Sequence, residues 1–194
     1  MKEQLTKQSI LLFEKKGFSS TSIQDITNAM NVTKGTFYYY FSSKEQLLMD
    51  IHDEYITDLI ERLIKISEDE LITQRDKLEE IIFLLINDIP NNGPSARVFF
   101  REMRHLVSEN RKKIKLKREE FRLNIEKVIS EGIANGEFLE SLRADMIAFG
   151  VLGIMNWTYN WYNPEGEILI KELCKIYTDL LLRGILTEEQ LKEF

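Results

Sequence analysis

VTKGTFYYYF, at residues 32–41, is the stretch of sequence that decides the fold. Thr33 is a favourable N-cap residue, so a short helix is predicted from Lys34 to Tyr40. Successive side chains on a helix are about 100° apart, so the four consecutive aromatic residues point all round it. So short a helix cannot bury every side, and at least two rings are expected to face something other than the domain core.

A second short helix is predicted just upstream of this stretch. Ser22 is a favourable N-cap residue, and Asp25 stands three residues later, as in a capping box. This helix is expected over residues 22–30, and a first helix is expected to end at Gly17. Only residues 31–32 remain for the turn, so the second and third helices form a helix-turn-helix.

The rest of the chain is also predicted to be helical. Apolar spacing and capping residues place helices at about 44–66, 73–88, 94–108, 110–135, 142–163 and 166–184. The segment PNNGP at 90–94 is expected to be the clearest loop. The predicted fold class is therefore all-α. It consists of an N-terminal three-helix head with the helix-turn-helix at residues 1–46 and a helical body at residues 47–194.

Composition and charge are compatible with this fold. Hydrophobic residues make up 43% of the chain and charged residues 30%, so disorder is not indicated. The net charge is −6, but residues 1–50 hold six lysines against five acids and the remainder carries −7. An acidic body does not exclude nucleic-acid binding, because phosphate contacts need a few well-placed donors.

Several classes of protein are disfavoured by the sequence. The single cysteine, Cys174, cannot form an internal disulfide, which fits a reducing cytoplasm. The N-terminus does not read as a signal peptide, and the longest apolar run, Met146–Met155, is too short to span a bilayer. His52 and His105 are not spaced as a metal pair, and Cys174 has no adjacent catalytic partner. We therefore expect no enzyme, no cofactor, no metal site and no membrane partner.

The segments TSIQDI at 21–26 and VTKGTFYYYFSSKEQLL at 32–48 resemble the N-terminal signature of the TetR repressor family. The match covers about residues 5–50. The resemblance implies a DNA-binding head, a helical ligand-binding body, and dimerisation through the last two long helices. It further implies a repressor that binds a palindromic double-stranded operator as a homodimer.

Eight residues are expected to bind DNA, namely Thr21, Lys34, Gly35, Thr36, Tyr38, Tyr39, Tyr40 and Lys44. Lys34 can reach a guanine acceptor or a phosphate from the start of the recognition helix, and Gly35 lets the backbone approach DNA closely. The hydroxyl groups suit phosphate oxygens. Lys44 resembles a family lysine that contacts the DNA backbone.

Three aromatic positions in this stretch need separate comment. The family often has a histidine where Tyr40 stands, which leaves the base preference of that contact open. Phe37 and Phe41 are expected in the core rather than on DNA. For Tyr39, packing on the fourth helix is the alternative.

Residues 149–162, FGVLGIMNWTYNWY, are apolar nearly all round a helix, which indicates burial against more than one surface. Gly150 and Gly153 would let another helix approach closely. An apolar stripe continues over 166–184, so a homodimer interface of two helices per subunit is expected at about 142–184. The alternative is that all of these residues form the core of the monomer.

Seven residues are expected to line a ligand cavity, namely Phe99, Met103, Leu106, Phe149, Leu152, Trp157 and Tyr159. Met103 is the best single candidate, because a flexible methionine suits an adaptable cavity. Plain core packing is the alternative for the stripe at 99–106.

The densest basic run is RKKIKLKR at 111–118. It is either a solvated face balanced by the glutamates at 119, 120 and 126, or an anion site at a pocket mouth. This run, REMRHL at 101–106 and NWTYNWYNP at 156–164 resemble TetR members that respond to fatty acyl-coenzyme A thioesters. The resemblance implies release from DNA by acyl-CoA or a similar small hydrophobic effector. Two alternatives stay open: a repressor that senses hydrophobic drugs, and a helical adaptor that does not bind DNA.

Overall fold

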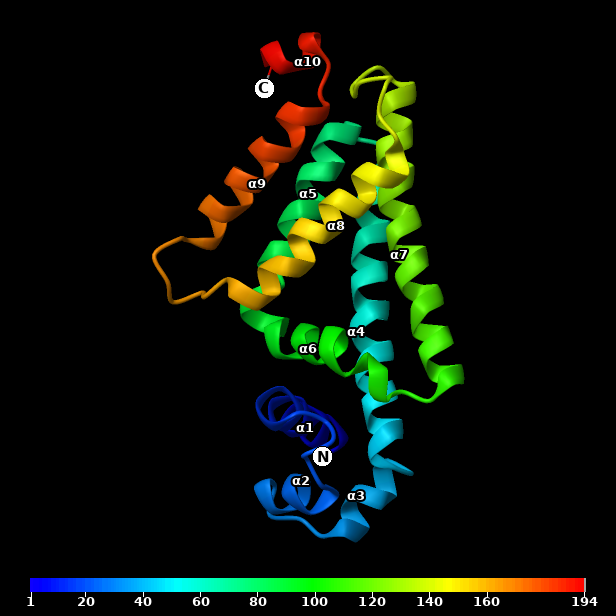
Figure 1. Ribbon diagram of the computed structural model, residues 1–194, viewed down its shortest axis with the longest axis vertical. Coiled ribbons are helices and arrows are strands. Elements are labelled where there is room, and N and C mark those ends of the chain that lie inside the picture. The colour runs from blue at the N-terminus through cyan, green and yellow to red at the C-terminus, as the bar shows by residue number, and fades with distance from the viewer. Residues whose placement is uncertain (194) are drawn as a thin grey trace. The chain divides into compact units, whose positions relative to one another are not determined.

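Residues 1–193 are described by a computed structural model, and they form ten α-helices and one short 3-10 helix (Figure 1). The elements are α1 (Lys2–Lys16), α2 (Ile23–Ala29), α3 (Lys34–Tyr40), α4 (Lys44–Ser67), α5 (Gln74–Asn87), α6 (Ile89–Glu102), η1 (Met103–His105), α7 (Ser108–Ala134), α8 (Ala144–Trp161), α9 (Ile170–Ile185) and α10 (Glu188–Glu193). The β pairing within these residues is an isolated bridge between Phe138 and Leu186. The predicted all-α fold is confirmed.

The chain divides into two compact units. Unit 1 contains residues 1–58 and 92–117, and unit 2 contains residues 59–91 and those from 118 onward. The helices α4, α6 and α7 each contribute residues to both units. The functional division at residues 46 and 47 stays a prediction, because packing units do not test it.

The starts of three helices in unit 1 are held by the predicted caps. The Asp25 amide donates to Ser22 Oγ at 3.0 Å, and the Ser22 amide donates back to Asp25 Oδ2 at 2.8 Å. Thr33 Oγ1 accepts from the Thr36 amide at 3.2 Å and caps α3, and Ser43 caps the start of α4. These side chains satisfy backbone N–H groups that lack a partner at a helix N-terminus.

The turn between α2 and α3 is as short as predicted. Asn31 has a φ of 52°, a left-handed conformation that asparagine tolerates better than most residues. The Val32 amide donates to the Thr27 carbonyl at 3.0 Å and closes the turn. The core of unit 1 then gathers side chains from α1 to α4, including the fully buried Leu5, Phe13, Ile26, Phe37, Phe41 and Leu47. The prediction of Phe37 and Phe41 as core residues is confirmed.

The predicted loop at 90–94 is wrong, because this segment lies within α6. The break falls at Asp88, which ends α5, and α6 begins at Ile89. Pro90 stands in the first turn of α6, where its missing N–H would have no helical partner. Pro94 stands in the second turn of α6, where its missing N–H removes the helical hydrogen bond to the carbonyl four residues earlier.

Unit 2 is built around α5, which packs against α8 and α9 (Figure 1). Its buried apolar residues include Leu78, Ile81, Ile82, Val151, Met155, Leu182 and Ile185. The Tyr159 hydroxyl donates to the Leu85 carbonyl at 2.9 Å and ties α8 to α5. The last long helix begins at Ile170 rather than at 166, because a turn closed by the Gly166 amide and the Asn163 carbonyl precedes it. Across residues 1–193, the helices lack the combined length and apolar character that a bilayer crossing needs.

Candidate functional site

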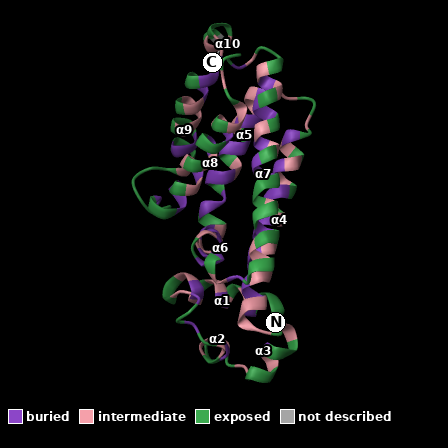
Figure 2. Ribbon diagram, turned by 45° about the vertical axis from the view of Figure 1, so that its right-hand side comes forward, coloured by how far each residue is buried: buried purple, intermediate pink, exposed green. Residues whose placement is uncertain are grey.

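The outer side of α3 projects several predicted DNA-binding residues into solvent (Figure 2). Lys34 and Gly35 are exposed, Tyr38 is 54% exposed and Tyr39 is 81% exposed. The opposite side of the helix holds Phe37, which is fully buried. The prediction that at least two rings face away from the core is therefore confirmed, and the alternative that Tyr39 packs on α4 is wrong.

Gly35 is not required by the fold of α3. A Cβ at this position would meet only Thr33 Oγ1, at an ordinary contact distance of 3.4 Å. Helix propensity disfavours glycine by about 1 kcal/mol relative to alanine, so the residue has a cost without a local structural benefit. Close approach of another backbone, such as that of DNA, is a physical reason for a glycine on this exposed face.

The remaining α3 positions are less accessible. Thr36 and Tyr40 are half-buried. The Thr36 hydroxyl lies 3.1 Å from that of Thr33, and the Tyr40 ring lies edge-on to Tyr39 with centroids 4.8 Å apart. These contacts hold the exposed Tyr39 ring from one side, while leaving both tyrosine hydroxyl groups free of a described protein partner.

Thr21 and Lys44 are used inside the protein. The buried Thr21 hydroxyl donates to the Gly17 carbonyl at 2.8 Å and lies 3.3 Å from that of Leu12. Lys44 Nζ donates to the carbonyls of Phe18 and Thr21 at 2.7 and 2.6 Å. This geometry gives Thr21 no free hydroxyl for a phosphate, and it makes Lys44 a clamp between α4 and the α1–α2 connection.

The environment of Lys44 explains the strength of that clamp. Its ammonium lies 4.3 Å from the centroid of the Phe18 ring, a cation–π distance. Burial lowers the pKa of Lys44, and the negative charge of Asp25 partly opposes this effect. The two hydrogen bonds to the carbonyl oxygens of Phe18 and Thr21 use two of the three ammonium hydrogens of Lys44.

The seven predicted ligand residues are divided between the two units. Phe99, Met103 and Leu106 are buried in unit 1, and the Phe99 ring packs against Tyr55 with centroids 5.1 Å apart. Their positions match the alternative of plain core packing.

The other four predicted ligand residues belong to unit 2. Phe149 and Trp157 are 53% and 67% exposed, Leu152 is half-buried, and Tyr159 is buried with its hydroxyl bound to a carbonyl. Their different exposures show that α8 turns these side chains to different sides.

Exposed apolar residues lie along one side of α8, and others lie on α9; exposed stretches of both helices are green in Figure 2. On α8 this apolar face includes Met146, Phe149, Gly150, Gly153 and Trp157, which share one side of a helix at spacings of three, four and seven residues. A Cβ on Gly150 or Gly153 would meet nothing within 4 Å. Leu169, just before α9, and Ile176 and Leu180 on α9 are exposed and share one side of that helix. Exposed apolar surface of this kind marks an interaction site.

The basic run at 111–118 is largely engaged in contacts within the protein. Lys117 pairs with Asp53 at 2.6 Å, and Arg111 donates to the Leu106 carbonyl at 2.9 Å. Lys113 pairs with Glu109, whereas Lys115 is exposed. These contacts favour the interpretation as a solvated, internally paired face over an anion site.

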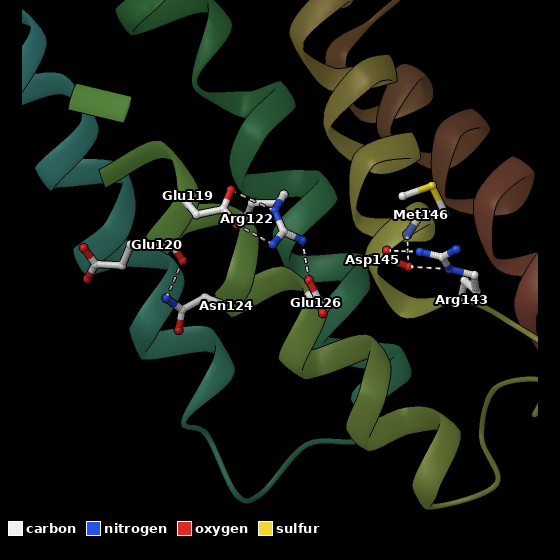
Figure 3. A network of polar contacts seen from close by, with 8 residues as sticks. All are labelled: Glu119, Glu120, Arg122, Asn124, Glu126, Arg143, Asp145 and Met146. Carbon is white, nitrogen blue, oxygen red and sulfur yellow. Dashed lines mark hydrogen bonds and ion pairs between the residues drawn. The ribbon is translucent and has the colours of Figure 1, made fainter. Parts of the chain in front are cut away.

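Two of the three glutamates that follow the basic run, Glu119 and Glu126, pair with Arg122 instead (Figure 3). Arg122 donates to Glu119 at 2.6 Å and also pairs with Glu126. These hydrogen bonds raise the pKa of Arg122 and lower that of Glu119. The guanidinium lies 5.0 Å from the centroid of the Phe149 ring, so it supports one edge of the apolar face on α8. At the start of α8, Arg143 pairs with Asp145, which accepts from the Met146 amide (Figure 3).

Sequence reasoning missed a cavity of about 800 Å³ in unit 2, bounded by α4, α5 and α9. None of the seven predicted ligand residues lines it. Its walls carry Glu79, Phe83 and Asp179 among other residues. The sequence contained one indication of this cavity, because Glu79 and Phe83 are four residues apart and therefore lie on one side of α5. Their proximity to α9, about a hundred positions later, was not visible in the sequence.

A capped helix-turn-helix with an exposed third helix, followed by a helical body, defines a DNA-binding transcriptional regulator. Comparison with family models agrees. The model of the tetR family of bacterial regulatory proteins matches residues 5–51, and that of the tetracyclin repressor-like C-terminal domain matches residues 72–185. The chain belongs to the TetR family and is a transcriptional regulator rather than an enzyme, as predicted.

Three known proteins illustrate the similarity. The repressor KstR2 of Rhodococcus jostii is 26% identical over 176 residues, covering 90% of this chain and 85% of that protein. The fatty acid metabolism regulator protein of Bacillus subtilis is 25% identical over 185 residues, covering 94% of both chains. The structure of AibR, solved in complex with isovaleryl coenzyme A and operator DNA, is similar in fold, with a TM-score of 0.84, 21% identity and coverage of 93% of this chain and 97% of that one.

Proposed function

We propose that this chain is a repressor that binds a palindromic operator as a homodimer and is released by a long-chain acyl-coenzyme A thioester. The observation that carries the DNA-binding part is the outer side of α3. Lys34, Gly35 and Tyr39 face solvent there, while Phe37 holds the helix on the core. A lysine and tyrosine hydroxyls beside an uncovered glycine suit a recognition helix in the major groove.

The apolar face of α8 and α9 supports the homodimer. Two such helices per subunit can pack as a four-helix interface, and the open Gly150 and Gly153 allow a close helix approach. Two-fold symmetry would then place two α3 helices in successive major grooves.

The dimer is tested by sedimentation at micromolar concentration. Gly150→Leu and Leu180→Glu should each give a monomer, because they block or charge the face without disturbing packing inside the chain. Leu116→Glu is the matched control, since Leu116 is an exposed leucine of α7 that belongs to unit 1, whereas the apolar face belongs to unit 2. A wild-type monomer that still binds operator tightly would contradict the proposal.

Three points support the effector. The segments at 101–106, 111–118 and 156–164 resemble acyl-CoA-responsive family members. A relative that aligns over 94% of the chain is a fatty acid metabolism regulator, and AibR holds a coenzyme A thioester within the same fold. Phe99, Met103, Leu106, Phe149, Leu152, Trp157 and Tyr159 stay the proposed lining, and their opening around an acyl chain is part of the proposal.

Release follows from linkage between the two ligands. An effector shifts the equilibrium only by its differential affinity for the DNA-binding and released states. A hundredfold loss of operator affinity needs a coupling of about 2.7 kcal/mol. The helix α4 is the proposed connection, because it contributes to both units and its first residue, Lys44, clamps the carbonyls beside α2.

The test is the fluorescence anisotropy of a labelled duplex from the upstream region of the gene, titrated with acyl-CoA of several chain lengths. Long thioesters should release the DNA at micromolar concentration, whereas the free fatty acid and free coenzyme A should not. Met103→Trp should blunt the response by filling the proposed lining. A complex that survives saturating long-chain thioester would contradict this effector.

A further inference from the structure

The cavity between α4, α5 and α9 has no lining residue in common with the residues named above for DNA, for the effector or for the exposed apolar face of α8 and α9. Its volume of about 800 Å³ lies within the range of small-molecule sites. All of its lining residues belong to unit 2, and they come from three helices rather than from a single loop. The cavity is therefore formed by packed helices.

One part of the lining is apolar. Ile66 of α4, Phe83 and Leu84 of α5, and Cys174 of α9 contribute to it. Phe83 is 45% exposed, so its ring is available to a ligand. Burial raises the pKa of the Cys174 thiol to about 11, so this side chain is neutral and behaves as a small apolar group. The apolar part of a ligand would pack against these side chains.

The other part of the lining is acidic. Glu79 and Glu80 of α5 and Asp179 of α9 line the cavity, and within residues 1–193 none of the three forms an ion pair. Burial raises the pKa of Glu79, the positive charge of Arg75 partly opposes this effect, and the negative charges of Asp76 and, to a smaller extent, Asp179 add to it. Glu79 of α5 and Asp179 of α9 line the same groove, so a cation held between them would interact favourably with both carboxylates.

The basic residues of the lining do not cancel this charge. Arg62 donates to the buried carboxylate of Asp88 at 2.6 Å, so its charge is already balanced. Lys175 is exposed and is the one remaining cation among the lining residues described. Three carboxylates therefore face one uncompensated lysine.

The cavity also lies on a different side of α9 from the proposed dimer face. Leu169, Ile176 and Leu180 share one side of the helix, since they are spaced by seven and four residues. At about 100° per residue, Cys174 and Thr178 project more than 100° away from that side, whereas Asp179 lies about 80° from its centre. A partner seated on that side would leave the part of the lining at Cys174 and Thr178 uncovered.

We propose that this groove is a binding site for a cationic amphiphile, a molecule with an ammonium or phosphonium centre on an apolar body. The apolar part packs on Phe83 and Leu84, and the positive centre lies between Glu79 and Asp179. The ring of Phe83 adds a cation–π contact. The proposal goes beyond the acyl-thioester function and does not depend on it, because the site uses different residues.

The test compares two probes of nearly equal size and opposite charge, tetraphenylphosphonium and tetraphenylborate. Each is titrated into the full chain without DNA by isothermal titration calorimetry. We expect saturable binding of the phosphonium with one site per chain and at least tenfold weaker binding of the borate. Equal binding of both ions, stronger binding of the borate, or no binding of the phosphonium up to 1 mM, about the affinity limit of a weak site, would overturn the proposal.

Variants locate the site. Glu79→Gln and Asp179→Asn should each raise the phosphonium Kd about threefold to tenfold, as expected for partly solvated charge contacts. Glu70→Gln is the matched control, because Glu70 is an exposed carboxylate outside the cavity lining. Thr178→Trp should abolish binding by filling the groove. If Glu79→Gln, Asp179→Asn and Thr178→Trp all bind like the wild type while their circular dichroism is unchanged, the phosphonium binds elsewhere and the proposal is wrong.

Discussion

Replacing Lys44 by methionine distinguishes a clamp within the protein from a contact with DNA. Methionine keeps the apolar stem over the Phe18 ring but removes the ammonium. The variant therefore lacks two hydrogen bonds from a charged donor, at 2.7 and 2.6 Å to the carbonyls of Phe18 and Thr21. Hydrogen bonds of this kind contribute about 1.5–3 kcal/mol each. Because Lys44 is only half-buried, we take the lower end and expect a decrease of about 2–3 kcal/mol in the free energy of unfolding.

The assay combines urea denaturation, followed by circular dichroism, with operator affinity measured at several salt concentrations. If Lys44 instead bound a phosphate in each of two subunits, its replacement would reduce the salt slope by about 1.8. A clamp predicts lower stability with an unchanged slope under conditions where the variant is folded. Lys34→Met is the control, since exposed Lys34 should show the reverse, a reduced slope and a stability change within about 0.5 kcal/mol. If Lys44→Met keeps full stability and reduces the slope, the clamp is refuted and Lys44 binds DNA.

Three further predictions concern single positions. Gly35→Ala should leave the chain at least as stable as the wild type, because its Cβ would meet only Thr33 Oγ1 at 3.4 Å. It should nevertheless weaken operator binding at least tenfold in an anisotropy titration. An unchanged operator affinity would mean that DNA does not approach this glycine. Gly132→Ala should lower the free energy of unfolding, measured in urea, by about 2 kcal/mol. Its Cβ would lie 2.3 Å from the buried Phe138 ring, and this overpacking outweighs the better helix propensity of alanine. A gain in stability would show that the Phe138 ring moves aside freely. Hydrogen bonds from the hydroxyl and amide of Ser22 lower the pKa of Asp25 from 3.8 to about 2. The contribution of Asp25 to the free energy of unfolding is therefore present above pH 4 and disappears as the pH falls through about 2. Asp25→Asn should remove this part of the loss of stability in acid, and a variant with the same pH profile of stability as the wild type would contradict the capping box.

The features that sequence predicted well depend on residues close together in the chain. Ser22 with Asp25, Thr33 with Thr36, and Phe37 on the inner side of α3 all follow from rules that act within one or two helical turns. These short-range rules located the helix-turn-helix and its exposed surface. They failed at 90–94, where two prolines suggested a loop, but the segment belongs to α6, with Pro90 in the first turn and Pro94 in the second.

The features that sequence missed depend on contacts between distant segments. Lys44 reads as a free lysine at a helix start, and only the fold brings the carbonyls of Phe18 and Thr21 to its ammonium. Phe99 and Trp157 are both expected to line a ligand cavity; the first is buried in unit 1 and the second is exposed in unit 2, and their place in one lining stays a proposal. Periodicity reports which residues share a side of a helix, but it does not report what covers that side.

The most direct test of a dimer that reads DNA through α3 is a hydroxyl-radical footprint on the upstream region of the gene. We predict two symmetric protected half-sites whose centres lie about one helical turn, 34–36 Å, apart. The double variant Lys34→Ala and Tyr39→Ala should erase this footprint while its urea midpoint stays unchanged, because both side chains are exposed. A single asymmetric footprint, or a symmetric one that survives the double variant, would contradict the assignment of α3 as the recognition helix.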